Sequence, residues 1–259
     1  MNGFALRWIS LAFQGLGQVA LLARDVLGAV FSGKTRGRDL TYQLYFIGAK
    51  SQSVVIITGA FTGMVMAAQT YFQFHRVRIE TATLAVVSVS MASELGPVLT
   101  GLMVAGRVGA ALAAELGTMR VTEQIDALRT LATHPVDYLV VPRVLATIIA
   151  LPLLTAESIA LGIAAGYALC VNYLDIDAAY TWHNMVKYTD VENILMGLTK
   201  AVVYGGIIGL ISCYKGMTCR EGAEGVGRAT TEAVVFSSIA ILISNFFLTL
   251  FLNRVFWPS

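Results

Sequence analysis

The chain has 259 residues, of which 56% are hydrophobic and only 13% are charged, and its mean hydropathy is +0.70. A typical soluble domain carries about 25% charged residues, so this composition excludes an ordinary soluble fold and predicts a membrane protein with several spans. The 18 Lys and Arg nearly balance the 16 Asp and Glu, which gives no reason to expect nucleic acid as a partner.

The amino-terminal segment, residues 1–32, is predicted to be an amphipathic helix in the membrane interface. Arg7, Gln14, Gln18 and Asp25 recur at intervals of seven, four and seven residues, which places them on one helix face. These polar residues interrupt the apolar run, so we do not expect a signal peptide. A helix with one polar and one apolar face is typical of a segment that lies along the membrane surface.

A phosphate-loop pattern overlaps the end of this segment. Residues 28–35 match GxxxxGK[ST], whose backbone amides bind phosphate when a strand precedes the loop and a helix follows it. Here a helix is predicted before the pattern and no parallel-sheet pattern follows, so we discount nucleotide binding. We interpret Lys34, with Arg36 and Arg38, as basic residues that face anionic lipid head groups.

Five later stretches are long and apolar enough to cross a hydrocarbon layer about 30 Å thick, which takes about 20 helical residues. They are residues 46–71, 82–110, 139–171, 194–214 and 233–256. The third contains Pro142 and Pro152, so we expect it to be tilted or kinked. The sequence therefore predicts an all-α integral membrane protein in which residues 1–259 form one transmembrane domain.

The distribution of Lys and Arg predicts the orientation of these spans. Eleven lie in the amino-terminal segment and in the connections after the second and fourth spans, against four on the opposite side. The larger group is Arg7, Arg24, Lys34, Arg36, Arg38, Arg120, Arg129, Arg143, Lys215, Arg220 and Arg228, and the smaller group is Arg76, Arg78, Lys187 and Arg254. Positive residues collect on the cytoplasmic side, so we expect a cytoplasmic amino terminus.

Glycines recur at four-residue spacing in three spans, which allows helices to approach closely. The pairs are Gly59 with Gly63, Gly162 with Gly166, and Gly205 with Gly209. They can serve helix packing within one bundle or a face between two copies. Five spans are few for a transporter built from two repeats, so a two-fold homodimer could supply the missing half.

Three ionisable residues lie inside the spans, where a charge usually faces a partner or a wet cavity. Glu94, Glu157 and Lys200 lie at similar distances from the predicted cytoplasmic boundary and can share one layer. Pro97 and Gly96 loosen the helix next to Glu94. Two interpretations remain open, namely an ion pair that locks helices together and a polar site that meets a charged or zwitterionic substrate.

Other candidate positions are less specific. Tyr71, Phe72, Phe74 and Val77 end the first span and form either an aromatic belt at the interface or the mouth of an apolar tunnel. The three cysteines and three histidines are widely separated and lack companions at ligand spacing. We therefore predict no metal site, no catalytic site and no cofactor of the chain's own, with the cysteines as packing residues.

The connection after the second span predicts a short cytoplasmic helix at residues 119–133. Thr122 can cap it, Glu123 and Asp126 favour its positive end, and Pro135 stops it. An apolar stripe follows on one side, at Ile125, Leu128 and Leu131. The helix either packs against the chain's own spans or seats a partner and transmits its motion.

The block from Glu94 to Leu128, which includes Glu94-Leu-Gly-Pro97, Arg107 and Glu123-Gln-Ile-Asp126, resembles the MlaE/YrbE permease family. The similarity continues through Pro135 and Pro142-Arg143 to the segment Arg228-Ala-Thr-Thr, and so covers essentially the whole chain. Two positions depart from many relatives: Ser93 replaces a basic residue, and Asn245 replaces an acid found in some of them.

The resemblance implies a permease of an ABC transporter that moves phospholipids between the inner and outer membranes of Gram-negative bacteria. Its implied partners are a second permease copy, a separate ATPase that binds ATP and Mg²⁺, a STAS-domain subunit on that ATPase, and a hexameric MCE-domain protein outside. The ATPase would contact Glu123, Gln124, Ile125, Asp126 and Leu128. The lipid cavity would include Glu94, Lys200, Leu95, Pro97, Tyr71, Phe74, Val77 and Asn245.

Two other functions remain open. In a proton-coupled secondary transporter, Glu94 itself would bind the proton and no ATPase would be needed. A passive membrane anchor for a periplasmic lipid-binding protein would tolerate the loss of ATPase docking. The predicted docking helix and the small number of spans favour the ABC permease over the proton-coupled transporter.

Overall fold

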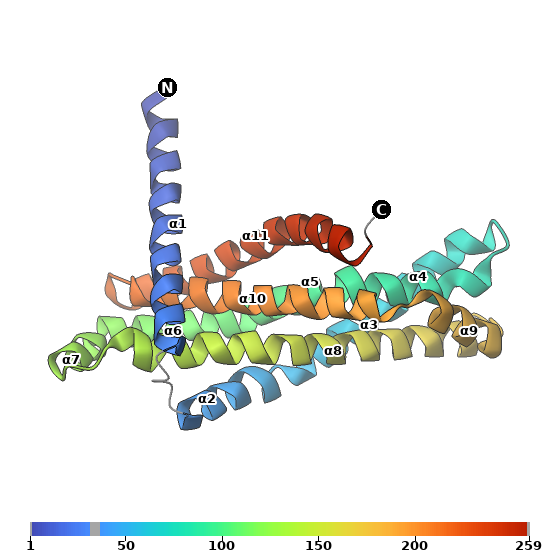
Figure 1. Cartoon of the computed structure of the whole chain (residues 1–259), viewed down its shortest axis with the longest axis horizontal. Helices are drawn as coiled ribbons and strands as arrows, with labels where there is room; N and C mark the ends of the chain where they lie inside the picture. The colour runs from blue at the N-terminus through green and yellow to red at the C-terminus, as the bar shows by residue number, and fades with distance from the viewer. Residues whose placement is uncertain (1, 32–36, 258–259) are drawn as a thin grey trace.

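The computed structural model describes residues 2–31 and 37–257, and this part of the chain contains helices and no strands. The α-helices are α1 (Asn2–Phe31), α2 (Gly37–Leu44), α3 (Gln52–His75), α4 (Thr83–Ser90), α5 (Gly96–Val104), α6 (Ala110–Val121), α7 (Gln124–Thr130), α8 (Val141–Asn172), α9 (Ala178–Tyr188), α10 (Val191–Met217) and α11 (Gly222–Phe256). The prediction of an all-α membrane protein is confirmed (Figure 1).

Five helical segments of the described chain are long and apolar enough to cross a membrane. They cover Gly37–His75, Glu80–Val121, Val136–Asn172, Val191–Met217 and Gly222–Phe256. The predicted number is correct, but every segment is longer than its predicted span. The difference arises because hydropathy marks only the apolar part of a helix, whereas the backbone hydrogen bonds continue into the polar ends.

Short π-helical turns join α-helices in the first two of these segments and begin the third. They are η1 (Tyr45–Ala49), η3 (Met91–Leu95), η4 (Ala105–Gly109) and η5 (Val136–Val140). The second segment also begins with a 3₁₀ turn, η2 (Glu80–Ala82). Turns of this kind inside long helices are frequently found at functional sites. One of them, η3, holds Glu94.

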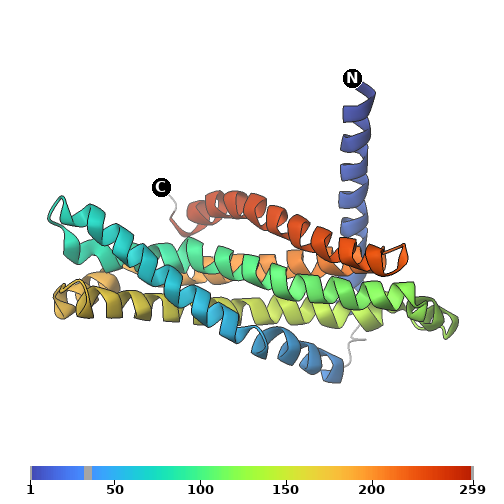
Figure 2. The same ribbon diagram turned by 180° about the vertical axis from the view of Figure 1, so that it is seen from behind.

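The amino-terminal helix α1 runs crosswise to the long helices, at the end of the bundle that carries α7 (Figures 1 and 2). Its carboxyl-terminal part packs on the bundle through buried Val26 and Ala29. The Tyr214 hydroxyl donates a hydrogen bond to Gln18. The predicted location of α1 in the membrane interface stays a prediction.

Part of the amino-terminal interpretation lies outside the described residues. This applies to Lys34 and Arg36, to the end of the phosphate-loop pattern, and to the side chain of Arg7. The start of that pattern, from Gly28, lies inside α1, so a helix and not a strand leads into it.

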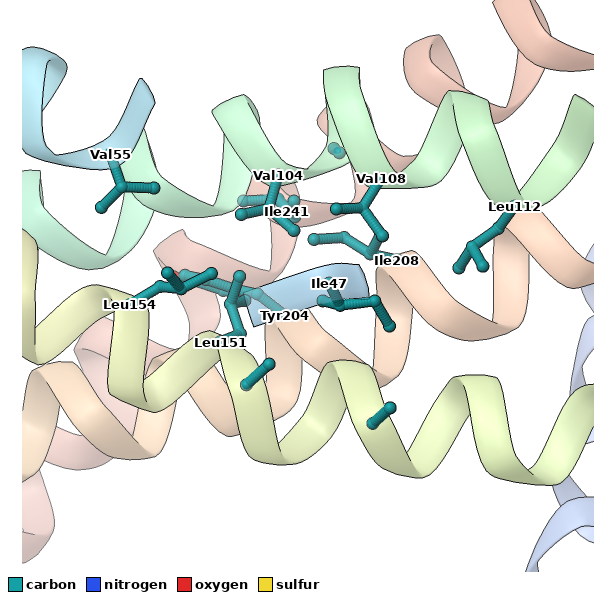
Figure 3. Close-up of a cluster of buried hydrophobic side chains, with 13 residues drawn as sticks. Ile47, Val55, Val104, Val108, Leu112, Leu151, Leu154, Tyr204, Ile208 and Ile241 are labelled. Carbon is teal, nitrogen blue, oxygen red and sulfur yellow. The ribbon is translucent and has the colours of Figure 1, made fainter. Parts of the chain in front are cut away.

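The largest core lies where α3, α5, α6, α8, α10 and α11 meet, and Figure 3 shows its side chains. Tyr204, Ile208 and Leu151 are fully buried there, with Val104 and Ile241 beside them. α8 passes through Pro152 as one continuous helix. The three cysteines are buried and free, and burial raises the pKa of the Cys219 thiol, as expected for packing residues.

The predicted glycine pairs serve contacts inside the chain. A Cβ atom on Gly63 would lie 2.0 Å from the carbonyl oxygen of Gly162, so α3 and α8 touch through their backbones. A Cβ atom on Gly205 would lie 2.6 Å from the carbonyl oxygen of Thr147, which joins α10 to α8 in the same way. Small residues therefore set the helix spacing within one bundle.

This contact predicts the effect of adding one methyl group. Gly63→Ala would force α3 away from α8, and overpacking of this kind costs typically about 1–3 kcal/mol. We expect the melting temperature of the purified protein in detergent to fall. Gly106→Ala is the matched control because nothing lies within 4 Å of its added Cβ. Equal melting temperatures for the two variants would contradict the contact.

Candidate functional site

Lys200 and Glu94 form the centre of a polar network between α10, η3 and α11. The Lys200 side chain is 0% exposed, and its Nζ lies 2.6 Å from Glu94 Oε1. Nζ also donates to Thr249 Oγ1 at 2.8 Å and to the backbone oxygen of Ser93 at 3.0 Å. An ammonium group has three donors. All three are therefore used, and the Lys200 side chain is held in one position.

The bond from Lys200 to Ser93 follows from the local sequence. Pro97 has no amide hydrogen, so the Ser93 oxygen, four residues earlier, cannot form the usual helical hydrogen bond with it. The lysine ammonium takes that place at 3.0 Å. Gly96 allows this turn to pack closely, because a Cβ atom there would lie 2.6 Å from Ile159 Cγ1. The predicted loosening next to Glu94 thus creates a binding partner for the buried lysine.

The Glu94 carboxylate connects this ion pair to the last span. Its Oε1 accepts from Thr249 at 3.0 Å, and its Oε2 accepts from Asn245 Nδ2 at 3.2 Å. Asn245 Oδ1 in turn accepts from the Tyr204 hydroxyl at 2.7 Å. The Glu94 side chain remains 34% exposed, whereas Lys200 is enclosed. The carboxylate is therefore the part of the ion pair that a ligand can reach.

A cavity of about 320 Å³ lies beside this carboxylate, between η3, the start of α10 and the end of α11. It is lined by Val89, Ser93, Glu94, Asn193, Met196, Asn253 and Trp257. Its polar lining therefore consists of one carboxylate, one hydroxyl, two amides and an indole. This set can hydrogen-bond a polar group, while the surrounding helix faces offer apolar surface.

Sequence reasoning found part of this site and missed part of it. Glu94, Lys200, Pro97 and Asn245 are in or next to the network. The ion pair joins different helices, as one of the two interpretations expects, and its role as a ligand site stays a prediction. Thr249 was missed, although it lies four residues after Asn245 and so on the same helix face. Also missed were Tyr204, Asn193, Asn253 and Trp257, which only the fold brings here.

Several predicted residues lie elsewhere. Glu157 is half-buried and forms no ion pair with a described residue, so the predicted three-residue ionic layer reduces to Glu94 and Lys200. Leu95 packs against a separate apolar cluster, as does Tyr71, whose ring lies 5.4 Å from that of His75. Phe74 lies in the last turn of α3, Val77 lies just after that helix, and neither lines the cavity. Their predicted place at a tunnel mouth stays a prediction.

The predicted helix at residues 119–133 is wrong in its bounds. α6 continues to Val121, and the Thr122 hydroxyl donates back to the oxygen of Thr118, so Thr122 ends α6 and does not cap α7. α7 begins at Gln124 after Glu123, whose φ of +60° makes the corner, and it ends at Thr130, before Pro135. The sequence pattern could not show this reversal because both sides of the corner are helical.

Some side chains in and next to α7 pack against the bundle, and others are exposed at the surface. Arg120 Nη1 lies 2.7 Å from Asp126 Oδ1, and Arg129 Nη1 lies 3.1 Å from the same oxygen. Ile125 is 1% exposed and belongs to the chain's own core, so its predicted contact with a partner is not supported. Glu123, Gln124 and Leu131 are exposed and Leu128 is partly buried. The surface available to a partner is therefore polar, with Leu131 at its edge.

Among the described residues, no three His, Cys, Asp or Glu side chains are grouped so that they could hold a metal ion. The predicted absence of a metal site and of a catalytic site stays a prediction.

These features define a multi-pass helical membrane protein with a polar site inside an apolar bundle and a short helix fixed to one end. A sequence model of the family described as permease MlaE matches residues 40–251. The chain belongs to this permease family, as the sequence motifs predicted.

Named relatives agree with this assignment. A probable ABC transporter permease protein of Rickettsia conorii is 46% identical over 248 residues, which cover 96% of this chain and 95% of the relative. A probable ABC transporter permease protein of Synechocystis is 42% identical over 93% of this chain and 92% of its own length. The chloroplast protein TRIGALACTOSYLDIACYLGLYCEROL 1 of Arabidopsis thaliana is 39% identical over 90% of this chain and 67% of its own length.

The ion pair predicts a specific pattern of stability. Removing one partner of a buried pair costs roughly 3–5 kcal/mol, and the one-third exposure of Glu94 reduces that figure here. We therefore expect Lys200→Met to lower the melting temperature in detergent, and the double variant Lys200→Met with Glu94→Gln to recover part of the loss. A double variant no more stable than Lys200→Met alone would contradict the pairing.

Proposed function

We propose that the chain is the phospholipid-conducting subunit of an ABC transporter in a bacterial inner membrane. The family assignment supports transport, and the name of the Arabidopsis relative contains that of a glycerolipid. The observation that carries the lipid class is the site itself. One carboxylate, paired on its inner side with Lys200, opens into a polar cavity of about 320 Å³ within an otherwise apolar bundle. Such a site matches a molecule with a polar head and apolar tails.

The exposed apolar face of α11, next to this cavity, supports the proposal that the bound molecule has acyl chains. Only 11% of the most apolar stretch of the α11 segment is buried, against 67% for the segment that contains α8. Exposed apolar side chains along α11 include Phe236, Ile239, Leu242, Ile243, Phe246, Phe247 and Leu250. Figure 1 shows α11 arching along one side of the bundle. A surface of this kind, next to a polar pocket, can hold acyl chains while the pocket holds the head group.

We further propose a homodimer in which α11 of two copies borders a shared cavity. An isologous pair would place the two Glu94 networks on either side of a two-fold axis. The ion pair is close to neutral as a unit, so the amides of Asn193 and Asn253 would contribute much of the head-group recognition. In ligand sites, apolar surface typically holds most of the ligand and a few polar groups fix its orientation.

The energy source in this proposal is a separate ATPase, which binds ATP and Mg²⁺ and contacts the exposed part of α7. Arg120 ties Asp126 to α6 through both carboxylate oxygens at 2.7 Å. α6 continues through η4 and α5 to η3, which carries Glu94. Val121 and Glu94 are 27 positions apart, which corresponds to about 40 Å of helix at 1.5 Å per residue. A push on α7 therefore has a continuous path to the site.

The remaining partners follow from the family resemblance. A STAS-domain subunit would bind the ATPase, and a hexameric MCE-domain protein would cover the opposite, periplasmic end, where α4 and α9 lie. The Lys and Arg distribution supports a cytoplasmic amino terminus. The net transport between inner and outer membranes would maintain the lipid asymmetry of the outer membrane.

The coupling surface predicts which α7 variants lose the ATPase. Glu123→Arg reverses an exposed charge, and like charges across an interface cost enough to weaken binding about tenfold or more. We expect this variant to lose the ATPase on co-purification, while the melting temperature of the permease itself stays unchanged. Ile125→Asp should instead lower the melting temperature, because Ile125 is buried within the chain.

Glu192→Arg is the matched control, since it reverses an exposed acid at the opposite end of the bundle. It should retain the ATPase. Retention of the ATPase by Glu123→Arg to the same extent would contradict docking at α7.

The source of energy separates this proposal from a proton-coupled carrier. In proteoliposomes that contain the whole complex, we expect fluorescent phospholipid transfer to need ATP and to continue after the proton gradient is collapsed with an uncoupler. Glu94 is already held by Lys200, Thr249 and Asn245, which favours a binding role over proton uptake. Transfer that stops with the gradient would support the carrier, and transfer independent of both would support a passive anchor.

A further inference from the structure

A second polar pocket lies at the α7 end of the bundle, between α2, η5 and the start of α8. Its volume is about 240 Å³, and its polar lining is Arg38, Asp39, Tyr42, Gln43, Tyr138 and Arg143. Along α8, Arg143 is 16 residues from Ile159, which lies against the Gly96 turn beside Glu94. This corresponds to about 24 Å at 1.5 Å per residue, so the pocket is a separate site from the Glu94 cavity.

Two buried polar groups of this pocket lack partners among the described residues. Gln43 is 8% exposed, and its side-chain oxygen Oε1 accepts no hydrogen bond from that part of the chain. Arg143 is 5% exposed, and its Nε likewise has no acceptor there. Buried polar atoms are hydrogen-bonded in the large majority of cases, because an unpaired one costs free energy. One unpaired acceptor and one unpaired donor on the same pocket indicate a ligand that offers both.

The other Arg143 nitrogens are engaged and fix the guanidinium in place. Nη2 lies 3.0 Å from Glu115 Oε1 of α6, and Nη1 donates to the Leu139 backbone oxygen at 2.8 Å. The pocket is therefore attached both to α8 and to the helix that leads into α7. Buried Gln43 and Arg143 form the inner wall of this pocket, and the exposed side chains of Arg38, Tyr42 and Tyr138 form its rim.

The chemistry of the lining is divided between donors and acceptors. Arg38 and Arg143 are cationic donors, and the hydroxyl groups of Tyr42 and Tyr138 add neutral ones. Asp39 and Gln43 offer acceptor oxygens. A simple inorganic anion would meet repulsion from Asp39 and would leave the Gln43 oxygen unpaired. A group that carries a phosphate and an ammonium satisfies both halves of the lining.

We propose that this pocket binds the head group of a zwitterionic phospholipid of the cytoplasmic leaflet, such as phosphatidylethanolamine. The phosphate lies towards Arg38 and Arg143, and the ammonium donates to Asp39 and Gln43. The exposed aromatic rings of Tyr42 and Tyr45 are suited to the membrane interface and flank the path of the acyl chains. The site goes beyond the proposed transport function because it lies away from the Glu94 cavity, and binding to it is measured without transport.

The test is native mass spectrometry of the purified full-length protein in detergent, titrated separately with phosphatidylethanolamine and phosphatidylglycerol of identical acyl chains. We expect the ethanolamine lipid to bind about tenfold more tightly, as an added charge-assisted hydrogen bond gives. Arg38→Gln should weaken both lipids. Gln43→Leu and Asp39→Asn should each reduce the preference for the ethanolamine lipid.

The matched control is Arg228→Gln, which removes an exposed arginine from the beginning of α11 and should leave both affinities unchanged. Equal binding of the two lipids, or unchanged binding by Arg38→Gln, would overturn the proposal. So would displacement of the bound lipid by inorganic phosphate, which would identify a free-phosphate site. A failure of ATP-driven transfer would not alter any of these binding results.

Discussion

A lysine ammonium buried in the membrane part of a protein must be paired, and in this chain Lys200 meets that requirement with three partners from two other segments. An unpaired charge in hydrocarbon is so unfavourable that the surrounding helices have to supply acceptors. The π-helical turn at Met91–Leu95, the missing amide of Pro97 and the polar face of α11 all serve this one group. The position of α11 relative to α5 and α10 follows from the same network.

Because Lys200 is enclosed, only its partner Glu94 is exposed to the cavity. Glu94 is fixed on one side by Lys200 and Thr249 and is open to the cavity on the other. A single pair thus connects three helical segments and leaves one carboxylate open to the cavity, where we propose that a ligand binds. Asn245 donates to Glu94, and because its amide is neutral it adds no second negative charge next to that carboxylate.

The two ends of the bundle are joined through continuous helix. The second segment runs from the Glu94 turn to the corner at Glu123, where Asp126 is bound by Arg120. Arg143 and Glu115 link the same segment to α8 and to the pocket under α2. Backbone contact at Gly63 and Gly162 then fixes α3 to α8. An event at either end therefore acts on a connected set of helices.

The sequence alone predicted the five spans, from apolar runs with few charges. It also pointed to Glu94 and Lys200, because a charged side chain in hydrocarbon is unfavourable. Both signals are local to a single helix. The bounds of α7, the burial of Ile125 and the roles of Thr249, Tyr204 and Asn193 were decided only by the tertiary structure. They depend on which helix faces meet, and the hydrogen bonds of Tyr204 with Asn245 and of Thr249 with Glu94 join residues 41 and 155 positions apart in the sequence. Hydropathy and spacing within a single helix carry no record of such contacts.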